Sequence, residues 1–362
     1  MNNTYTDLVR SRASGSWLSI LDALAPELEQ VILKPGKRHI DCPVHGGSKG
    51  FRLFRDANLS GGGICSTCGP KPDGFAVLMW LRQWSFPETL AAVATRLGLN
   101  NDGVHRPIVL NQRALAVCDK QDDQRLIKAL RKLWRESKPT THPSAAPVRF
   151  YLRSRGLEDP IVDWPSLRFH PAMQYWDENW ELVGHYPGML ALVENDEKTV
   201  TLHRTFLTSE GEKAPVEFPK KMMGVPSGKS ASGVAIRLGI PGRVLSVTEG
   251  IENALAITEA TGMVTWPLIS ASMMPAFTIP SGVEKLMIWA DLDRNNTGMV
   301  AAEALAARAK TTGVDVEIRV PDGPLLDYVK GLDWLDVYNS KGPNAFAVRS
   351  SRLGSGHGRL CF

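Results

Sequence analysis

The sequence has no long run of apolar residues. A helix needs about 20 such residues to cross a bilayer, and no stretch of that kind occurs among the 362 residues. The first residues, MNNTYTDLVRSR, are polar and lack the apolar core of a signal peptide. We therefore expect a cytoplasmic protein that contacts no membrane. With 43% hydrophobic and 22% charged residues, the chain has enough apolar material for more than one domain core.

Cysteine is also scarce, with five in the whole chain. We expect no structural disulfides, because the cytosol keeps thiols reduced. The spacing of the cysteines then becomes the useful signal. Cys42, Cys65 and Cys68 cluster, whereas Cys118 and Cys361 stand alone and are interpreted as an incidental thiol and a tail residue.

A phosphate-binding loop of the ATPase kind is missing too. The segment GVPSGKS at 224–230 has three residues between its glycines, where the motif requires four. It also lacks the strand before it and the helix after it that such a loop needs. The sequence therefore predicts neither an ATPase nor a helicase motor.

Charge of one sign is not in large excess, because the net charge is only +4. The two halves differ, however. Residues 1–155 carry 23 Lys and Arg against 13 Asp and Glu, and the remaining residues carry 19 against 25. A basic N-terminal part suits a polyanionic partner, and an acidic C-terminal part suits divalent cations. Chance surface charge explains the same numbers, so the motifs must decide.

Two pairs of metal-binding side chains occur near the N-terminus. Cys42-Pro-Val-His45 is followed, after 19 residues, by Cys65-Ser-Thr-Cys68. Each pair is spaced so that two side chains can hold one tetrahedral ion, and the segment FRLFRDANLSGGGI between them suits a hairpin that joins the pairs. Thiolates exclude magnesium and favour zinc. We predict one zinc ion, which either only holds a small fold together or also serves recognition.

Basic and aromatic residues lie between the two ligand pairs. Arg52 and Arg55 alternate with Phe51 and Phe54. Positive charge with aromatic faces is typical of surfaces that bind single-stranded nucleic acid. An ordinary core with a charged surface explains these four residues equally well.

Further along, the pattern predicts a basic amphipathic helix at 126–137 after an unpatterned stretch at 101–125, and then a linker at 138–147. A short helix at 148–157 and a strand pair at 189–196 and 198–208 follow. From 243, predicted strands at 243–250, 263–270, 285–293 and 314–320 alternate with helices at 251–262 and 298–312. Such alternation indicates a parallel sheet covered by helices.

Carboxylates follow two strands of this predicted sheet. One strand ends at Glu249 and another at Asp291-Leu-Asp293. Working groups of open α/β sheets lie at the carboxyl ends of strands, and residues two apart in extended chain point to one side. Three carboxylates brought together need divalent cations, as a phosphoryl-transfer centre does. A strand followed by a solvated turn is the alternative for each acid alone. Asp333 and Asp336 add two acids three apart, which a surface helix also explains.

Together these residues resemble the Toprim-domain DNA primases of phages, plasmids and mobile elements, in which a zinc ribbon precedes the catalytic core. The ribbon's knuckles are matched by His39-Ile-Asp-Cys42-Pro-Val-His45 and Cys65-Ser-Thr-Cys68-Gly69. The Toprim signature is matched by Glu249-Gly250 and Asp291-Leu-Asp293. A later family element resembles KGLDWLD and makes Asp333 a further candidate acid, although Leu332 departs from its pattern.

The resemblance covers most of the chain and implies a multidomain α/β fold. It places an N-terminal zinc ribbon with flanking helices in 1–100 and a basic helix and linker in 101–147. A mixed, basic α+β subdomain follows in 148–242, then a Toprim-like parallel α/β domain in 243–342 and a flexible tail in 343–362.

The resemblance also implies a nucleotidyltransferase that makes short RNA primers on single-stranded DNA by two-metal catalysis, for replication of a phage, plasmid or integrated element. Glu249, Asp291 and Asp293 would hold Mg²⁺ or Mn²⁺, and the zinc ribbon would engage the template. Ribonucleoside triphosphates are the implied substrates, and a replicative helicase acting in trans is the implied partner. Contacts to template or nucleotide are expected from the basic side chains Arg52, Arg55, Arg204, Lys213, Lys220 and Lys221.

Two other functions use the same features. A Toprim topoisomerase or nuclease uses such acids to break DNA, but a topoisomerase needs a nucleophilic tyrosine in a large separate domain, and after Asp293 only Tyr328 and Tyr338 remain. A DNA-binding adaptor without activity would pair zinc with a degenerate Toprim core. Such adaptors are shorter, and the complete set of acids argues against degeneracy.

Overall fold

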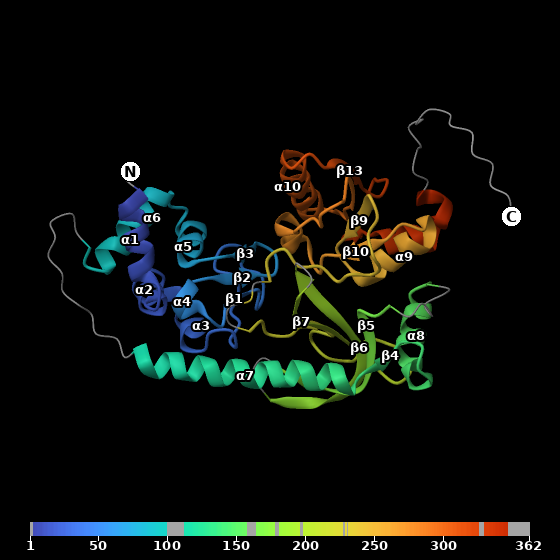
Figure 1. Ribbon diagram of the computed structural model, residues 1–362, viewed down its shortest axis with the longest axis horizontal. Helices are drawn as coiled ribbons and strands as arrows, with labels where there is room; N and C mark the ends of the chain where they lie inside the picture. The colour runs from blue at the N-terminus through green and yellow to red at the C-terminus, as the bar shows by residue number, and fades with distance from the viewer. Residues whose placement is uncertain are drawn as a thin grey trace.

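The computed structural model describes residues 3–99, 112–157, 164–177, 181–195, 198–226, 229, 231–325 and 329–346. Figure 1 shows three parts: N-terminal helices with a small sheet, a twisted antiparallel sheet, and a C-terminal helix-covered sheet. The predicted fold class is confirmed. None of the helices in the described part of the chain is long and apolar enough to cross a membrane.

The N-terminal part surrounds a three-stranded antiparallel sheet in the order β1-β2-β3. Trp17 is buried in the core of the N-terminal part, and its ring lies edge-on to that of Phe75, with ring centroids 4.8 Å apart. A Cβ atom at Gly74 would lie 2.1 Å from the Trp17 ring, so this position requires glycine. The elements are α1 (Asn3–Ala13), α2 (Trp17–Leu24), a 3-10 helix (Pro26–Leu28), α3 (Glu29–Leu33), β1 (Phe51–Leu53), α4 (Ala57–Ser60), β2 (Gly63–Cys65), β3 (Gly69–Lys71), α5 (Gly74–Arg82) and α6 (Phe86–Arg96).

A single long helix, α7 (Gln112–Glu136), leads into the second part. The expected unpatterned stretch at 101–125 is therefore wrong from Gln112 onward, and residues 100–111 lie outside the described ones. Near the end of α7, Leu133 and Trp134 pack against the middle sheet. Figure 1 shows α7 running beneath both the N-terminal part and this sheet.

The middle sheet has five antiparallel strands in the order β4-β5-β6-β7-β8. The stretch expected to be a linker is part of it, because Lys138 and Pro139 pair with Phe169 and Arg168. Its polar groups serve this packing, and Arg149 donates hydrogen bonds to three of its backbone carbonyls. The elements are β4 (Lys138–Pro139), a 3-10 helix (Pro143–Ala145), α8 (Ala146–Ser154), β5 (Leu167–Trp176), β6 (Leu182–Asn195), β7 (Lys198–Phe206) and β8 (Lys220–Met222).

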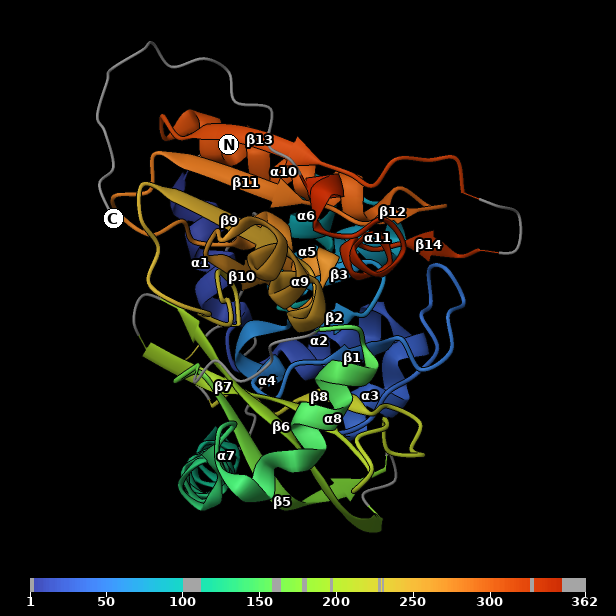
Figure 2. The same ribbon diagram turned by 90° about the vertical axis from the view of Figure 1, so that its right-hand side faces the viewer.

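The C-terminal part contains a parallel four-stranded sheet in the order β10-β9-β11-β13 (Figure 2). Its strands are β9 (Val244–Thr248), β10 (Thr265–Pro267), β11 (Lys285–Trp289) and β13 (Asp315–Arg319). Its helices are α9 (Ile251–Thr261), α10 (Thr297–Thr311), α11 (Trp334–Lys341) and two 3-10 helices (Ala271–Ala276 and Pro343–Phe346). A separate antiparallel pair joins β12 (Leu292–Asp293) to β14 (Gly331–Leu332).

Side chains of β11 alternate between two apolar layers, as the pleat requires. Leu286 and Ile288 belong to the core that includes α10, whereas Met287 and Trp289 belong to the cluster with α9 and α11. The start of the expected flexible tail is wrong, because Phe346 is only 1% exposed and packs on Trp289 and Trp334. Residues 347–362, with Cys361, lie outside the described ones.

Candidate functional site

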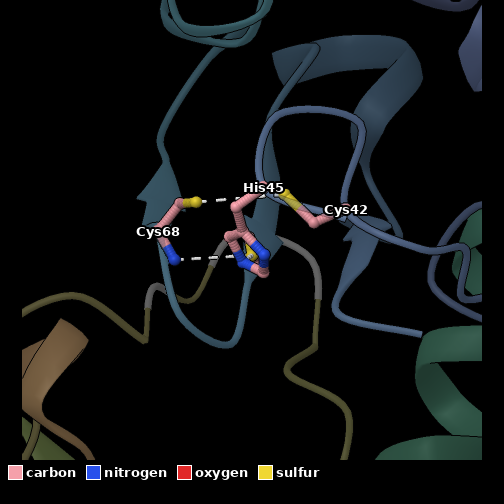
Figure 3. A group of neighbouring side chains, drawn as sticks. Cys42, His45 and Cys68 are labelled. Atoms are coloured by element: carbon pink, nitrogen blue, oxygen red, sulfur yellow. Dashed lines mark hydrogen bonds between the residues drawn. The ribbon is translucent and has the colours of Figure 1, made fainter. Parts of the chain in front are cut away.

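The four predicted zinc ligands come together in the N-terminal part. Cys42 and His45 lie in the loop before β1, Cys65 ends β2, and Cys68 lies in the turn before β3. One potential ligand atom from each lies within 4.8 Å of the others. Cys42 Sγ and Cys68 Sγ are 3.9 Å apart, and His45 Nε2 is 3.3 Å from Cys65 Sγ. Figure 3 shows three of these side chains converging.

The chemistry of this group fits zinc. Burial and the neighbouring Cys65 and Cys42 thiols raise the pKa of Cys68 to about 12. A bound zinc ion would reverse this shift, because a coordinated thiol loses its proton. Three sulfurs and one imidazole nitrogen make the tetrahedral, closed ligand set that structural zinc uses. In the described part of the chain, this is the one group of three or more such side chains with the spacing of a metal site.

Residues beside the ribbon were predicted less well. Phe51 was expected to offer an aromatic face, but it is fully buried and packs on Trp80. Arg52 is partly covered, and burial lowers its pKa. Arg55 is half-buried after β1. His39, from the same motif, stays outside the ligand group and has a pKa lowered to about 4 by burial and by Arg52.

The predicted acids lie at the carboxyl edge of the parallel sheet. Glu249 follows β9 directly, and Asp291 follows β11 after one residue. Asp293 is tied to the start of α10, where it accepts backbone hydrogen bonds of 2.9–3.0 Å from Asn295, Thr297 and Gly298. Among the described residues, the acids are not part of a group with the spacing of a metal site, unlike the four predicted zinc ligands.

The neighbouring carboxylates add to the effect of burial on the pKa of Asp291. Burial, followed by the charges of Glu249, Asp333 and Asp293, raises its pKa to about 8. Burial also raises the pKa of Glu249, and Asp293 adds to this effect. Burial and repulsion between the carboxylates both favour the protonated form, and further positive charge brought close to them would oppose this. The arrangement therefore fits divalent cations, which would restore the ionised form.

Asp333 has a structural role that the spacing did not reveal. It is the N-cap of α11, accepting a 2.8 Å hydrogen bond from Asp336 N, and the Asp336 carboxylate accepts one from Asp333 N. The two acids thus form a capping box at the start of α11. Their spacing had instead predicted two neighbours on one face of a helix. Burial raises the pKa of Asp333, and its charge still acts on Asp291.

The predicted basic residues separate onto two faces of the middle sheet. Arg204 pairs with Lys221 across β7 and β8, so these side chains share one face. There the Arg204 guanidinium lies 5.2 Å from the Phe206 ring centroid, and Lys221 Nζ lies 4.5 Å from that of Tyr175. Lys220 points the other way, toward the acids. Lys213 lies near it, since Lys220 and Asp333 both act on the pKa of Lys213.

Four residues near the acids were not predicted. Asn253 donates to Asp291 Oδ1 (3.1 Å) and accepts a hydrogen bond from Leu335 N (3.1 Å), which joins the acidic edge to α11. Glu252 is buried and contacts Lys220 and Tyr151. Arg155, at the end of α8, acts on the pKa of both Lys213 and Asp333. A signal was present for one of them, because Asn253 interrupts a helix face that is otherwise apolar.

Three family models match the chain. A zinc-binding domain of primase-helicase matches residues 37–75, and a Toprim domain matches residues 244–344. A domain of unknown function matches residues 124–233, which hold most of α7 and the middle sheet. The curated proteins contain no match to this chain.

Several solved structures are similar to the chain. The primase fragment of the bacteriophage T7 primase-helicase protein is 14% identical, with a TM-score of 0.35 and coverage of 85% of this chain and 96% of that chain. The zinc-binding and RNA polymerase domains of the Aquifex aeolicus primase are 12% identical, with a TM-score of 0.37 and coverage of 90% and 83%. The DnaG catalytic core is 15% identical, with a TM-score of 0.43 and coverage of 62% and 77%. By its family-model matches, the chain joins an N-terminal zinc ribbon of the primase type to a Toprim domain, which is the composition of a Toprim DNA primase.

Proposed function

We propose that this protein is a DNA primase that synthesises short RNA primers on single-stranded DNA. The observation that carries the proposal is the meeting of acidic and basic groups at one edge of the C-terminal sheet. Glu249 and Asp291 lie there with raised pKa values, and the charge of Lys220 acts on Glu249. Nucleotidyl transfer requires acidic side chains that bind metal ions and basic side chains that bind phosphates.

In this mechanism Glu249, Asp291 and Asp293 would hold the divalent cations. The cations, Mg²⁺ or Mn²⁺, would supply acidification of the primer 3′-hydroxyl and neutralise the pyrophosphate that leaves. Asn253 orients Asp291 through its 3.1 Å hydrogen bond. Lys220 and Lys213 bind the triphosphate of the incoming ribonucleotide. The carboxylates act as ligands, so no covalent intermediate forms on the protein.

The zinc ribbon is proposed to present the template to this edge. Lys49 of the ribbon pairs with Glu217 of the middle part at 3.2 Å. A Cβ atom at Gly69 would lie 3.4 Å from Ser272 Cβ, so β3 runs against the 3-10 helix at Ala271–Ala276. The backbone of Ala271 in turn hydrogen-bonds Glu249. These contacts support delivery of the template beside the candidate cation ligands.

A priming assay tests the proposal. The protein is incubated with single-stranded DNA, labelled ribonucleoside triphosphates and Mg²⁺, and the products are separated by size. We expect short RNA products that require template. DNA cleavage without synthesis would instead support a nuclease or topoisomerase, and retardation of DNA without either product would support an adaptor. As for a topoisomerase tyrosine, Tyr338 packs on Phe346, and Tyr328 lies outside the described residues.

The Asp291→Asn variant tests the cation ligands. Asparagine keeps the shape of the side chain but cannot supply the negative charge, so we expect primer synthesis to fall at least about 100-fold. Asp315→Asn is a matched control, because Asp315 is 74% exposed at the far end of β13. Wild-type priming by Asp291→Asn would contradict the assignment. A replicative helicase in trans, in a phage, plasmid or integrated element, completes the proposed setting.

A further inference from the structure

We propose that Glu252 is a positioning residue that holds the Lys220 ammonium at the acidic edge, ready to bind the triphosphate of the incoming nucleotide. The inference rests on the proposed function and deepens it. Glu252 lies in the first turn of α9 and is 5% exposed. Lys220 Nζ lies 2.8 Å from its carboxylate oxygens, and Tyr151 Oη donates a 2.5 Å hydrogen bond to Oε1.

The carboxylate of Glu252 is held in its ionised form by these partners. Burial alone would raise its pKa, but Lys220 and then the Tyr151 hydroxyl outweigh burial and hold the pKa at about 2. A buried charge of this kind persists only when it is paired. The pairing therefore also restrains the Lys220 ammonium.

The position of the pair gives Lys220 its use. Glu252 is three residues after Glu249, so the turn that supplies a candidate cation ligand also anchors the lysine. The Lys220 side chain remains 38% exposed. An ammonium has three N–H donors, so one can remain on Glu252 while others reach a phosphate. A free lysine samples many conformations, and this anchor removes that freedom before the substrate arrives.

A purely structural role for Glu252 is the competing explanation. The carboxylate joins α8 of the middle part, through Tyr151, to α9 of the C-terminal part. Tyr151→Phe separates the two roles, because it removes one hydrogen bond from Glu252 and leaves the contact with Lys220. If Glu252 is a positioning residue, Tyr151→Phe should raise the Michaelis constant for nucleotides less than Glu252→Gln does.

The experiment is a double-substitution cycle with Glu252→Gln and Lys220→Ala, each alone and together. Priming is measured with varied ribonucleoside triphosphates, and binding of ATP with Mg²⁺ is measured by equilibrium dialysis. We expect Glu252→Gln to raise KM and the ATP dissociation constant about tenfold and to add nothing in the Lys220→Ala background. Tyr151→Phe should lower Tm while raising KM less than Glu252→Gln does. Glu259→Gln, exposed on the same helix, is the matched control.

The outcomes separate this inference from the proposed function. Additive effects of the two substitutions, or a Glu252→Gln variant with lowered Tm and unchanged ATP binding, would overturn the positioning role. Absence of primers from the wild type would refute the primase proposal, while the ATP-binding cycle would still test whether Glu252 acts through Lys220. A wild-type protein that binds no ATP would refute the inference itself.

Discussion

Asp291 and Glu252 are two carboxyls near the same sheet edge, yet their pKa values move in opposite directions. Burial and neighbouring acids raise the pKa of Asp291 to about 8. Lys220 and Tyr151 hold that of Glu252 at about 2. Among the described residues no positive side chain pairs with Asp291, whereas Lys220 already pairs with Glu252. The sheet edge thus has two different sites. Asp291 lies where metal ions would bind, and Glu252 already pairs with the Lys220 ammonium.

His203 predicts a pH dependence of stability. It lies on β7, 8% exposed, and burial and Lys220 lower its pKa to about 4, with Glu252 acting in the opposite sense and Arg204 in the same sense as Lys220. The unfolded chain takes up this proton near pH 6.5 and the folded chain only near pH 4. Stability is therefore full above about pH 6.5 and is lost as the pH falls toward 4.

Urea unfolding at pH 7 and pH 5 checks this prediction. We expect His203→Gln, which stays neutral, to lose about 2 kcal/mol less of its unfolding free energy over this interval than the wild type does. His185→Gln, at an exposed position on β6, serves as the control and should follow the wild type. Equal losses in all three proteins would show that His203 does not titrate in this way.

Sequence spacing was enough to find residues whose chemistry is local. The zinc ligands are two short pairs, and the acids follow apolar strands directly. Glu252 and Tyr151 could not be found in this way, because their meeting depends on how α8 packs on α9, 101 residues later in the chain. The split of Lys220 from Lys221 follows from strand alternation, but their strand, β8, has only three residues and little pattern.

At the scale of elements, the capping box of α11 gives a second prediction. Asp333→Asn should leave the unfolding free energy unchanged within about 0.5 kcal/mol, because asparagine caps as well as aspartate, whereas Asp333→Ala should cost about 1 kcal/mol. Thermal or urea unfolding measures this difference. Priming by Asp333→Asn then reports on the carboxylate alone: activity lost at unchanged stability supports a role with the cations, and full activity leaves Asp333 as a cap only.

Elements with strong periodicity were predicted and others were not. The alternating strands and helices after residue 243 match the structure closely, because the central strands β9 and β11 are buried along almost their whole length. β5 was missed, since Pro171 and polar residues interrupt its pattern. The segment 138–147 was taken for a linker because its Pro, Thr and Ser residues are typical of loops, yet Ser137 and Thr140 beside it and within it are buried.

At the scale of the whole molecule, removal of zinc should unfold one part and spare another. The ribbon has three strands of three residues each, too few to be stable without the metal. We expect one zinc per chain by elemental analysis. Chelation or Cys65→Ser should open tryptic sites at Lys49, Arg52 and Arg55, while residues 243–342 stay resistant.

Ser66→Ala is the control for this experiment, because Ser66 is exposed between the two cysteines of its knuckle. Its zinc content and tryptic pattern should equal those of the wild type. Equal resistance of the ribbon in Cys65→Ser and the wild type would show that the helices around it hold it without metal. The order of ribbon, mixed middle part and Toprim domain was predictable because each part has its own local pattern. The contacts between the parts were not predictable.

The contact of Glu252 with Lys220 and Tyr151 crosses the boundary near residue 243. The Toprim domain therefore cannot simply be joined, at that boundary, to the middle part of a relative. A recombinant chain that took its C-terminal part from this protein and its middle part from a relative without matching partners would bury an unpaired carboxylate, at a cost of about 3–5 kcal/mol. Viable exchange would have to move α8 and β8 together with the Toprim domain, so these segments are expected to be inherited as one block.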